Sequence, residues 1–190
     1  KQNTHEGGVH VPFIVHWPGA VADPGGLRRQ FHHVNDVAPT IYEALGIEAP
    51  RVYRGYDQLP VTGTSMRYCF DAEPDAPSRK QVQYFEMMGH RALYADGWKV
   101  VTRHQSGTPF DDDQLYHVAA DPSECRDLAA EMPEKVAELV DRWWAEAADH
   151  GVLPLDDRTV ELFGARFRER SPHPVDRHYT YRPPLTHIPA

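Results

Sequence analysis

Four short apolar segments joined by turns place the strongest constraint on how this chain can fold. Each has the length and the β-branched and aromatic content that favour a strand. They cover residues 81–87, 90–94, 98–102 and 114–118. Asp96-Gly97 between the second and the third is a strong hairpin signal, because this pair accepts the positive φ angles of a two-residue turn. The segments predict a small antiparallel sheet.

A long amphipathic helix is predicted directly after these strands. Its apolar residues recur at spacings of three and four and are Val136, Leu139, Val140, Trp143, Trp144 and Ala147. Pro133 suits the first turn and Gly151 suits the stop. Because such a stripe buries one face of a helix, we expect it to cover the sheet. Both tryptophans are then interpreted as core residues rather than as stacking surfaces for a ligand.

The first 80 residues suggest an α/β layer structure. Residues 9–17 form a short apolar run closed by Pro18-Gly19, which predicts a strand buried on both faces. Residues 35–46 predict a helix, with Asn35 or Asp36 at its start and Gly46 at its end. Residues 47–80 contain four prolines and are expected to be irregular.

Shifts in composition divide the chain into three parts. We expect residues 1–80 to belong to a main α/β domain and residues 81–151 to form the sheet-and-helix subdomain. Residues 152–190 are rich in proline and arginine and are expected to form an extended tail packed along the body. The predicted class is α/β overall, and α+β within these 190 residues.

Charge and cysteine content limit the possible partners and compartment. The net charge is −8 and no basic run is present, which argues against binding to nucleic acid or to a membrane surface. No apolar run approaches the ~20 residues of a membrane span. Cys69 and Cys125 stand in unrelated contexts, which favours two free thiols in the cytoplasm. A single disulfide in a periplasmic or secreted protein is the alternative.

Motifs for metal binding or nucleophilic catalysis are missing from the sequence. Neighbouring His32 and His33 would point to opposite faces of a strand, and no H-x-x-x-H or H-E-x-x-H is present. There is no G-x-S-x-G. The acidic runs 111–113 and 156–157 are interpreted as solvated loops. We therefore expect no metal site built from this chain alone.

Five segments, in order, resemble segments of the arylsulfatases. They are Lys1 to Gly19 with Glu6-Gly7-Gly8; Gln30 to Ile41 with Asp36-Val37-Ala38-Pro39-Thr40; Gly63-Thr64-Ser65-Met66; Gln83 to Ala92 with Asp96-Gly97-Trp98-Lys99; and Leu115-Tyr116-His117-Val118 leading to Asp121-Pro122-Ser123-Glu124. His117 departs from the family pattern, which has Asp there. The resemblance implies the C-terminal portion of an alkaline-phosphatase-like fold, in which one helix packs on a four-stranded antiparallel sheet.

The resemblance also implies a chemistry. Sulfatases hydrolyse sulfate esters of small molecules with a formylglycine made from Cys or Ser and a divalent cation, usually Ca²⁺. No C-x-P-x-R or S-x-P-x-R occurs here, and Cys69 is followed by Phe70-Asp71-Ala72. The nucleophile and the cation ligands would then belong to an N-terminal part of the same protein. This chain alone would be inactive.

The resemblance assigns one role to a residue of this chain: sulfatases carry a lysine five residues before this Glu that contacts the sulfate oxygens, and Lys1 stands five before Glu6. On spacing alone, Lys1 would be interpreted as a disordered terminal lysine. A fixed ammonium stabilises the negative charge that shifts to the bridging oxygen as the S–O bond breaks. Glu6, Gly7 and Gly8 are expected to shape the loop, because Gly-Gly permits φ > 0 and close backbone approach. Glu6 is also a candidate to cap a neighbouring N–H or to orient Lys1. His5 is a candidate for the substrate pocket or an exposed loop histidine. Met87 and His90 are further pocket candidates.

Two other functions stay open on the sequence. A phosphonate or phosphate ester hydrolase of the same superfamily would differ at the upstream site. A non-catalytic binding or oligomerisation module would need no upstream site. An exposed apolar face where missing strands of the sheet belong would count against such a module, because it indicates a larger body.

Overall fold

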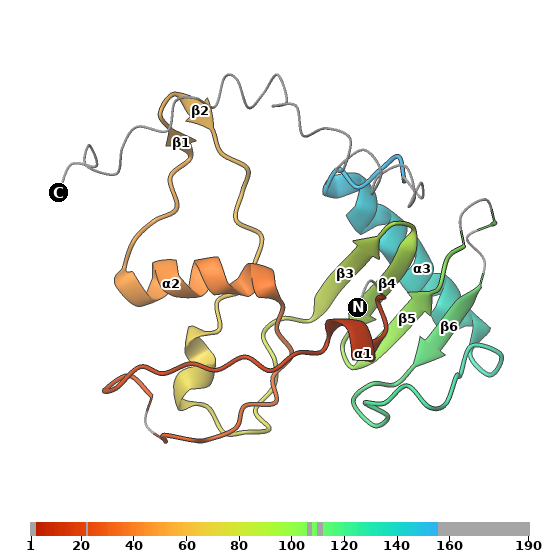
Figure 1. Ribbon diagram of the computed structural model, residues 1–190, viewed down its shortest axis with the longest axis horizontal. Coiled ribbons are helices and arrows are strands. Elements are labelled where there is room, and N and C mark those ends of the chain that lie inside the picture. Colours follow the sequence, from red (N-terminus) through yellow and green to blue (C-terminus); the bar gives the residue numbers. More distant parts are fainter. Residues whose placement is uncertain (1–2, 22, 106–107, 110–111, 156–190) are drawn as a thin grey trace, which may run out of the picture.

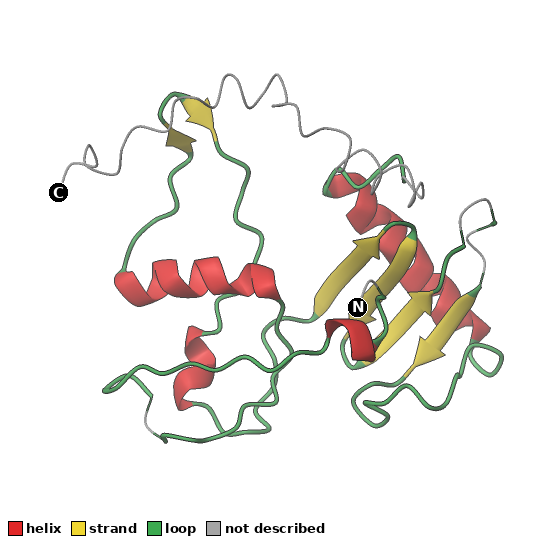
Figure 2. Ribbon diagram, viewed as in Figure 1, coloured by secondary structure: helices red, strands yellow, loops and turns green. Residues whose placement is uncertain are grey.

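The computed structural model describes residues 3–21, 23–105, 108–109 and 112–155, which form an α+β structure (Figures 1 and 2). The helices are α1 (Glu6–Val9), α2 (Val37–Leu45) and α3 (Pro133–Asp149), with 3-10 turns η1 (Val34–Asp36) and η2 (Arg67–Asp71). The strands are β1 (Val52–Tyr53), β2 (Tyr56–Asp57), β3 (Val82–Met87), β4 (His90–Ala95), β5 (Trp98–Thr102) and β6 (Asp113–Tyr116).

The larger sheet confirms the prediction of four antiparallel strands. Its order is β3-β4-β5-β6, so each strand pairs with its neighbour in sequence. The β4–β5 turn is Asp96-Gly97, with φ angles of 48° and 84°, and it brings Ala95 opposite Trp98. These are the positive angles that an Asp-Gly pair was expected to supply.

Helix α3 covers one face of this sheet, as its apolar stripe predicts. Leu93, Val100 and Leu115 from the sheet share a core with Leu139 and Trp143 from the helix. Trp143 is only 1% exposed, and its indole N–H donates to the Phe85 carbonyl at 3.0 Å. Apolar burial and this hydrogen bond thus hold the helix on the sheet.

The opposite face of the sheet is apolar at its centre and carries the start of the chain. Side chains alternate along a strand, so Ala92, Val101 and Tyr116 point away from α3 and form a second small cluster with Phe85. Residues 3–9 lie on this side. Figure 1 shows α1 in front of the sheet and α3 behind it.

The strand predicted over residues 9–17 is wrong. Val9 ends α1, and residues 10–17 follow as an irregular segment with exposed apolar side chains, Ile14 being 87% exposed. A buried strand needs neighbours that complete its backbone hydrogen bonds. Among the described residues, strands occur only in the sheets β1-β2 and β3-β4-β5-β6, and neither includes this segment.

Helix α2 confirms the other prediction for the first 80 residues. It ends at Gly46, whose φ of 64° is the left-handed conformation expected of a helix stop.

Residues 47–80 are less irregular than expected, because they contain the β1-β2 hairpin and η2. Stacked rings of Phe31, which lies before α2, and Tyr94 on β4, with centroids 3.6 Å apart, join the first 80 residues to the larger sheet.

The end of the described chain packs on the sheet-and-helix unit. Val152 and Leu155 contact the α3 core. The rest of the expected tail, from residue 156 on, lies outside the described residues, and the three-part division of the chain stays a prediction. No helix in the described residues has the length and apolarity needed to cross a membrane.

Candidate functional site

The segment Asn3–Val9 is held tightly against the sheet, although Lys1 itself lies outside the described residues. Thr4 is buried, and its hydroxyl donates to the Arg91 carbonyl on β4 at 3.0 Å. A Cβ on Gly8 would lie 2.0 Å from the Asn3 carbonyl oxygen, so only glycine permits this close turn. Gly7 has open space around it. The prediction that this pair shapes the loop therefore depends on Gly8.

A buried lysine and one other carboxylate fix Glu6, the lysine at its side chain and the carboxylate at its backbone. Lys99 on β5 is 0% exposed, and its ammonium lies 2.6 Å from Glu6 Oε1 and 3.1 Å from Glu124 Oε1. The Glu6 backbone N–H donates to Glu124 Oε2 at 2.8 Å. The free side of the Glu6 carboxylate faces His10 Nδ1 at 3.0 Å. Sequence reasoning did not identify Lys99 or Glu124 as partners of Glu6.

The ring of His5 is half-buried and oriented rather than exposed on a loop. Its Nδ1 lies 2.7 Å from Asn3 Oδ1, and its Nε2 lies 2.9 Å from Gln114 Oε1 at the start of β6. Its ring also meets Tyr116 edge-on, with centroids 6.2 Å apart. These contacts hold the imidazole over the face of the sheet opposite α3.

The structure brings the three candidate pocket residues to one region. Met87 and His90 are paired in the β3–β4 register, and Met87 is 43% exposed. Burial lowers the pKa of His90, and the nearby charges of His104, Arg103 and His5 lower it further against the opposing charge of Glu86. His5 is placed on the same side through its neighbour Thr4, whose hydroxyl binds the carbonyl of Arg91, the residue after His90. Their contact with a substrate stays a prediction.

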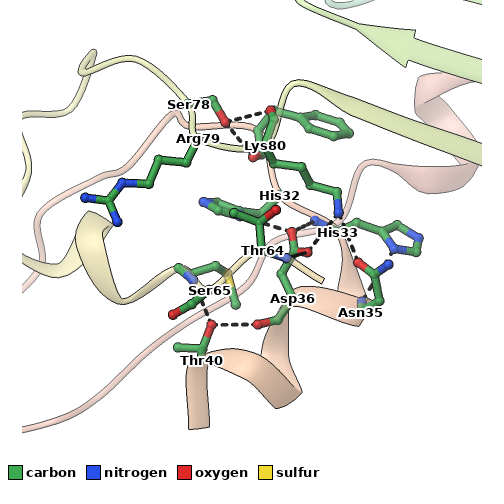
Figure 3. A network of polar contacts seen from close by, with 12 residues as sticks. His32, His33, Asn35, Asp36, Thr40, Thr64, Ser65, Ser78, Arg79 and Lys80 are labelled. Carbon is green, nitrogen blue, oxygen red and sulfur yellow. Dashed lines mark hydrogen bonds and ion pairs between the residues drawn. The ribbon is translucent and has the colours of Figure 1, made fainter. Parts of the chain in front are cut away.

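A second buried network surrounds Asp36 at the start of α2 (Figure 3). Its carboxylate is 2.9 Å from the Lys80 ammonium and 3.1 Å from His32 Nδ1, and it accepts backbone N–H groups of His33 and Thr64. Burial alone would raise the pKa of Asp36, but these four hydrogen bonds hold it well below its usual range. The network joins α2 to the segments before η2 and β3.

The five segments that carry the family resemblance meet in these two clusters. Glu6, Lys99 and Glu124 bring together the first, fourth and fifth segments. The second and third meet where Thr64 N–H binds Asp36 and where Met66 N–H donates to Thr40 Oγ1 at 2.8 Å. Residues far apart in sequence thus form two compact polar centres.

The described residues do not fit a sulfatase nucleophile or cation site. No three His, Cys, Asp or Glu side chains among them gather where a metal ion could bind. Both cysteines are free, as predicted; Cys69 is buried, which raises the pKa of its thiol, and Cys125 is exposed. Of the acidic run, Asp113 pairs with Arg91 at 3.1 Å rather than standing free in solvent. Residues 110–111 and 156–157 lie outside the described part.

Comparison with known proteins finds that the chain is similar to several sulfatases. Arylsulfatase K of Xenopus laevis is 26% identical over 145 residues, 73% of this chain and 26% of that protein. Human arylsulfatase D is 29% identical over 172 residues, covering 76% of this chain and 28% of the relative. Steryl-sulfatase of Rattus norvegicus is 41% identical over 63 residues, 32% of this chain and 11% of that protein. No protein-family model matches the chain.

The fold agrees with this relationship. A bacterial sulfatase, described with the metabolism of multiple glycosaminoglycans by Bacteroides thetaiotaomicron, superposes with a TM-score of 0.60 at 21% identity. The superposition covers 78% of this chain and 31% of that structure. The chain spans about a quarter of the length of the curated relatives that it matches over most of its own length. In sequence and in fold, the chain is thus similar to a C-terminal portion of the sulfatases.

Proposed function

We propose that this chain completes the sulfate-binding side of an enzyme that hydrolyses sulfate esters of small molecules. The whole enzyme would cleave R–O–SO₃⁻ with water to R–OH and sulfate. Its formylglycine nucleophile and divalent cation, usually Ca²⁺, would be held by residues outside this chain. The observation that carries the proposal is the anchoring of residues 3–9 by Glu6, Lys99 and Glu124, because this segment begins two residues after Lys1.

Lys1 is the residue to which this proposal gives the chemical role. Its ammonium would bind sulfate oxygens and stabilise the charge that develops on the bridging oxygen. His5, Met87 and His90 would border the pocket, on the sheet face opposite α3. The oriented ring of His5 and the exposed side chain of Met87 suit recognition of the organic part of the ester.

Exposed apolar side chains support a role within a larger body rather than as an independent module. Val11, Phe13 and Ile14 are all more than half exposed. On α2, Ile41 and Leu45 are also more than half exposed. Isolated exposed apolar residues are ordinary, but this many on one 40-residue region is typical of a surface covered by other protein. The two free thiols support a reducing compartment such as the cytoplasm.

The test measures ester hydrolysis by the protein encoded by the complete gene. We expect turnover of 4-nitrophenyl sulfate to exceed that of 4-nitrophenyl phosphate and of a phenylphosphonate monoester. Lys1→Ala should lower kcat for the sulfate ester by about 10²–10³-fold, the usual loss when one charge-stabilising contact is removed. The isolated 190-residue chain should hydrolyse none of the three.

Each alternative has its own result in this assay. Preferred hydrolysis of the phosphate or phosphonate ester would assign the chain to a phosphorus-specific hydrolase of the same superfamily. Turnover by the isolated chain would contradict the placement of the nucleophile outside it. A complete gene product without any esterase activity would favour the binding module.

A further inference from the structure

We propose that Lys99, together with Glu124, is a positioning residue that sets the place of Lys1 in the sulfate site. The inference rests on the proposed function, because it assigns to Lys1 the sulfate contact described above. It adds a second lysine, which nothing in the family resemblance marks as functional. Lys99 would act through Glu6 and never touch the substrate.

Burial and charge exclude a direct contact between Lys99 and sulfate. The lysine is 0% exposed, and two carboxylates already surround its ammonium. One positive and two negative charges leave the cluster with a net charge of −1 when all three groups are ionised, which repels an anion. The cluster therefore suits the positioning of the chain around Glu6 and does not form a second sulfate site.

The geometry shows how Lys99 can control the segment that follows Lys1. Glu6 is held at its side chain by Lys99 at 2.6 Å and at its backbone by Glu124 at 2.8 Å. Two contacts of different direction fix both the position and the orientation of this residue. Two residues earlier, Thr4 is bound to the Arg91 carbonyl. Asn3 to Glu6 therefore follow one defined path over the sheet.

Stability alone gives a weak reason for such a cluster. Replacing a buried ion pair by apolar side chains of similar volume is often neutral or stabilising, because desolvation of the charges offsets their attraction. A buried pair does, however, restrict geometry, since each charge has few acceptable partners. In a sulfatase, a displacement of Lys1 by about 1 Å would be costly, because misplacement on that scale lowers rates by about 10²-fold.

A first experiment measures amide hydrogen exchange in the 190-residue chain, comparing Lys99→Met with Lys80→Met. Lys80 is a matched control, because it is also a buried lysine paired with a carboxylate, but it contacts Asp36 and Asn35 rather than residues 3–9. We expect faster exchange at the amides of Glu6, Gly8, Val9 and His10, which are all hydrogen-bonded, in Lys99→Met only. Glu124→Gln, which keeps the side-chain volume, should show the same local loss if Lys99→Met does not fold.

A second experiment measures sulfate ester hydrolysis by the complete gene product carrying the same substitutions. We expect Lys99→Met to lower kcat/KM by about 10–100-fold and Lys99→Arg to recover part of this loss. In a Lys1→Ala background, Lys99→Met should have almost no further effect, because a positioning residue has nothing left to position. A merely structural role would lower activity equally in both backgrounds.

The outcomes separate this inference from the proposed function. Equal exchange of residues 6–10 in Lys99→Met and Lys80→Met, or wild-type kcat/KM in Lys99→Met, would overturn the role of Lys99 alone. Additive losses from Lys1→Ala and Lys99→Met would overturn it as well. A wild-type enzyme that hydrolyses no sulfate ester would overturn the proposed function.

Discussion

Asp36 and Lys80 form a buried ion pair, with 2.9 Å between Oδ1 and Nζ, that ties the start of α2 to the segment before β3. Removing one partner leaves the other charge buried without compensation. We expect Lys80→Met to lower the free energy of unfolding by about 3–5 kcal/mol. Urea denaturation followed by tryptophan fluorescence measures this. Lys135→Met is the control, because its pair with Glu138 is exposed and should change stability by at most about 0.5 kcal/mol.

The same carboxylate makes stability depend on acid. Because the pKa of Asp36 is below its usual range in the folded protein, the unfolded chain binds a proton first as the pH falls. The contribution of Asp36 is therefore complete above about pH 4, near its unfolded pKa, and is lost progressively below that pH. In Asp36→Asn, the free energy of unfolding, measured by urea titration, should change less between pH 4 and pH 2 than in the wild type. If the free energy of unfolding of Asp36→Asn falls with pH as steeply as that of the wild type, Asp36 is not the group responsible.

Trp143 combines apolar burial with a hydrogen bond, so two substitutions separate its contributions. Trp143→Phe leaves the Phe85 carbonyl without its indole donor, at a cost of about 1–3 kcal/mol. Trp143→Ala also opens a cavity and should cost about 3–5 kcal/mol. The neighbouring Trp144 is only partly buried and serves as the comparison. Thermal and urea unfolding of Trp143→Ala and Trp144→Ala should rank the buried position as the more costly.

Two histidines should make the stability of the fold depend on pH a second time, closer to neutral pH. Burial lowers the pKa of both His33 and His90, so the unfolded chain takes up protons first as the pH falls below about 6.5. Stability from these groups is complete above that pH and declines as the pH falls through the folded pKa values. The melting temperature should therefore fall between pH 7 and pH 5. His90→Gln should make this fall shallower. A steeper fall would contradict a lowered pKa of His90 in the folded protein.

The two thiols should differ in reactivity. Cys125 is exposed, whereas Cys69 is buried, has a raised pKa and lies with its Sγ 3.3 Å from His32 Nε2. Only the thiolate is nucleophilic, so both burial and pKa slow Cys69. At pH 8, iodoacetamide should label Cys125 first, as measured by mass spectrometry of peptides. Labelling of Cys69 should require unfolding, and equal rates would contradict its buried position.

The sequence predicted the sheet and α3 well because their signals are local. Asp96-Gly97 defines its turn by its own backbone preference, and the stripe through Leu139 and Trp143 needs only one apolar face to cover. The strand over residues 9–17 was wrong because an apolar run becomes a buried strand only beside other strands. Nothing within residues 9–17 encodes whether such neighbours exist.

The partners of Glu6 could not be predicted from spacing, since Lys99 and Glu124 lie 93 and 118 residues away. One signal was nevertheless present. Lys99 occupies the same face of β5 as Val101, which is fully buried, so strand periodicity places its charge inside the protein. A lysine at such a position requires a carboxylate partner, and this reasoning would have directed attention to acidic residues outside the sheet.

The contacts of Glu6 also set an order for folding. Glu6 cannot dock until both β5 and the turn at Glu124 exist, and Glu124 is synthesised 118 residues later. At a typical synthesis rate this delay is on the order of 10 s. The β3–β4 and β4–β5 hairpins need only local closure and form long before that. Residues 3–9 are therefore placed after these hairpins, so the sulfate contact proposed for Lys1 is assembled only once the distant sheet has formed.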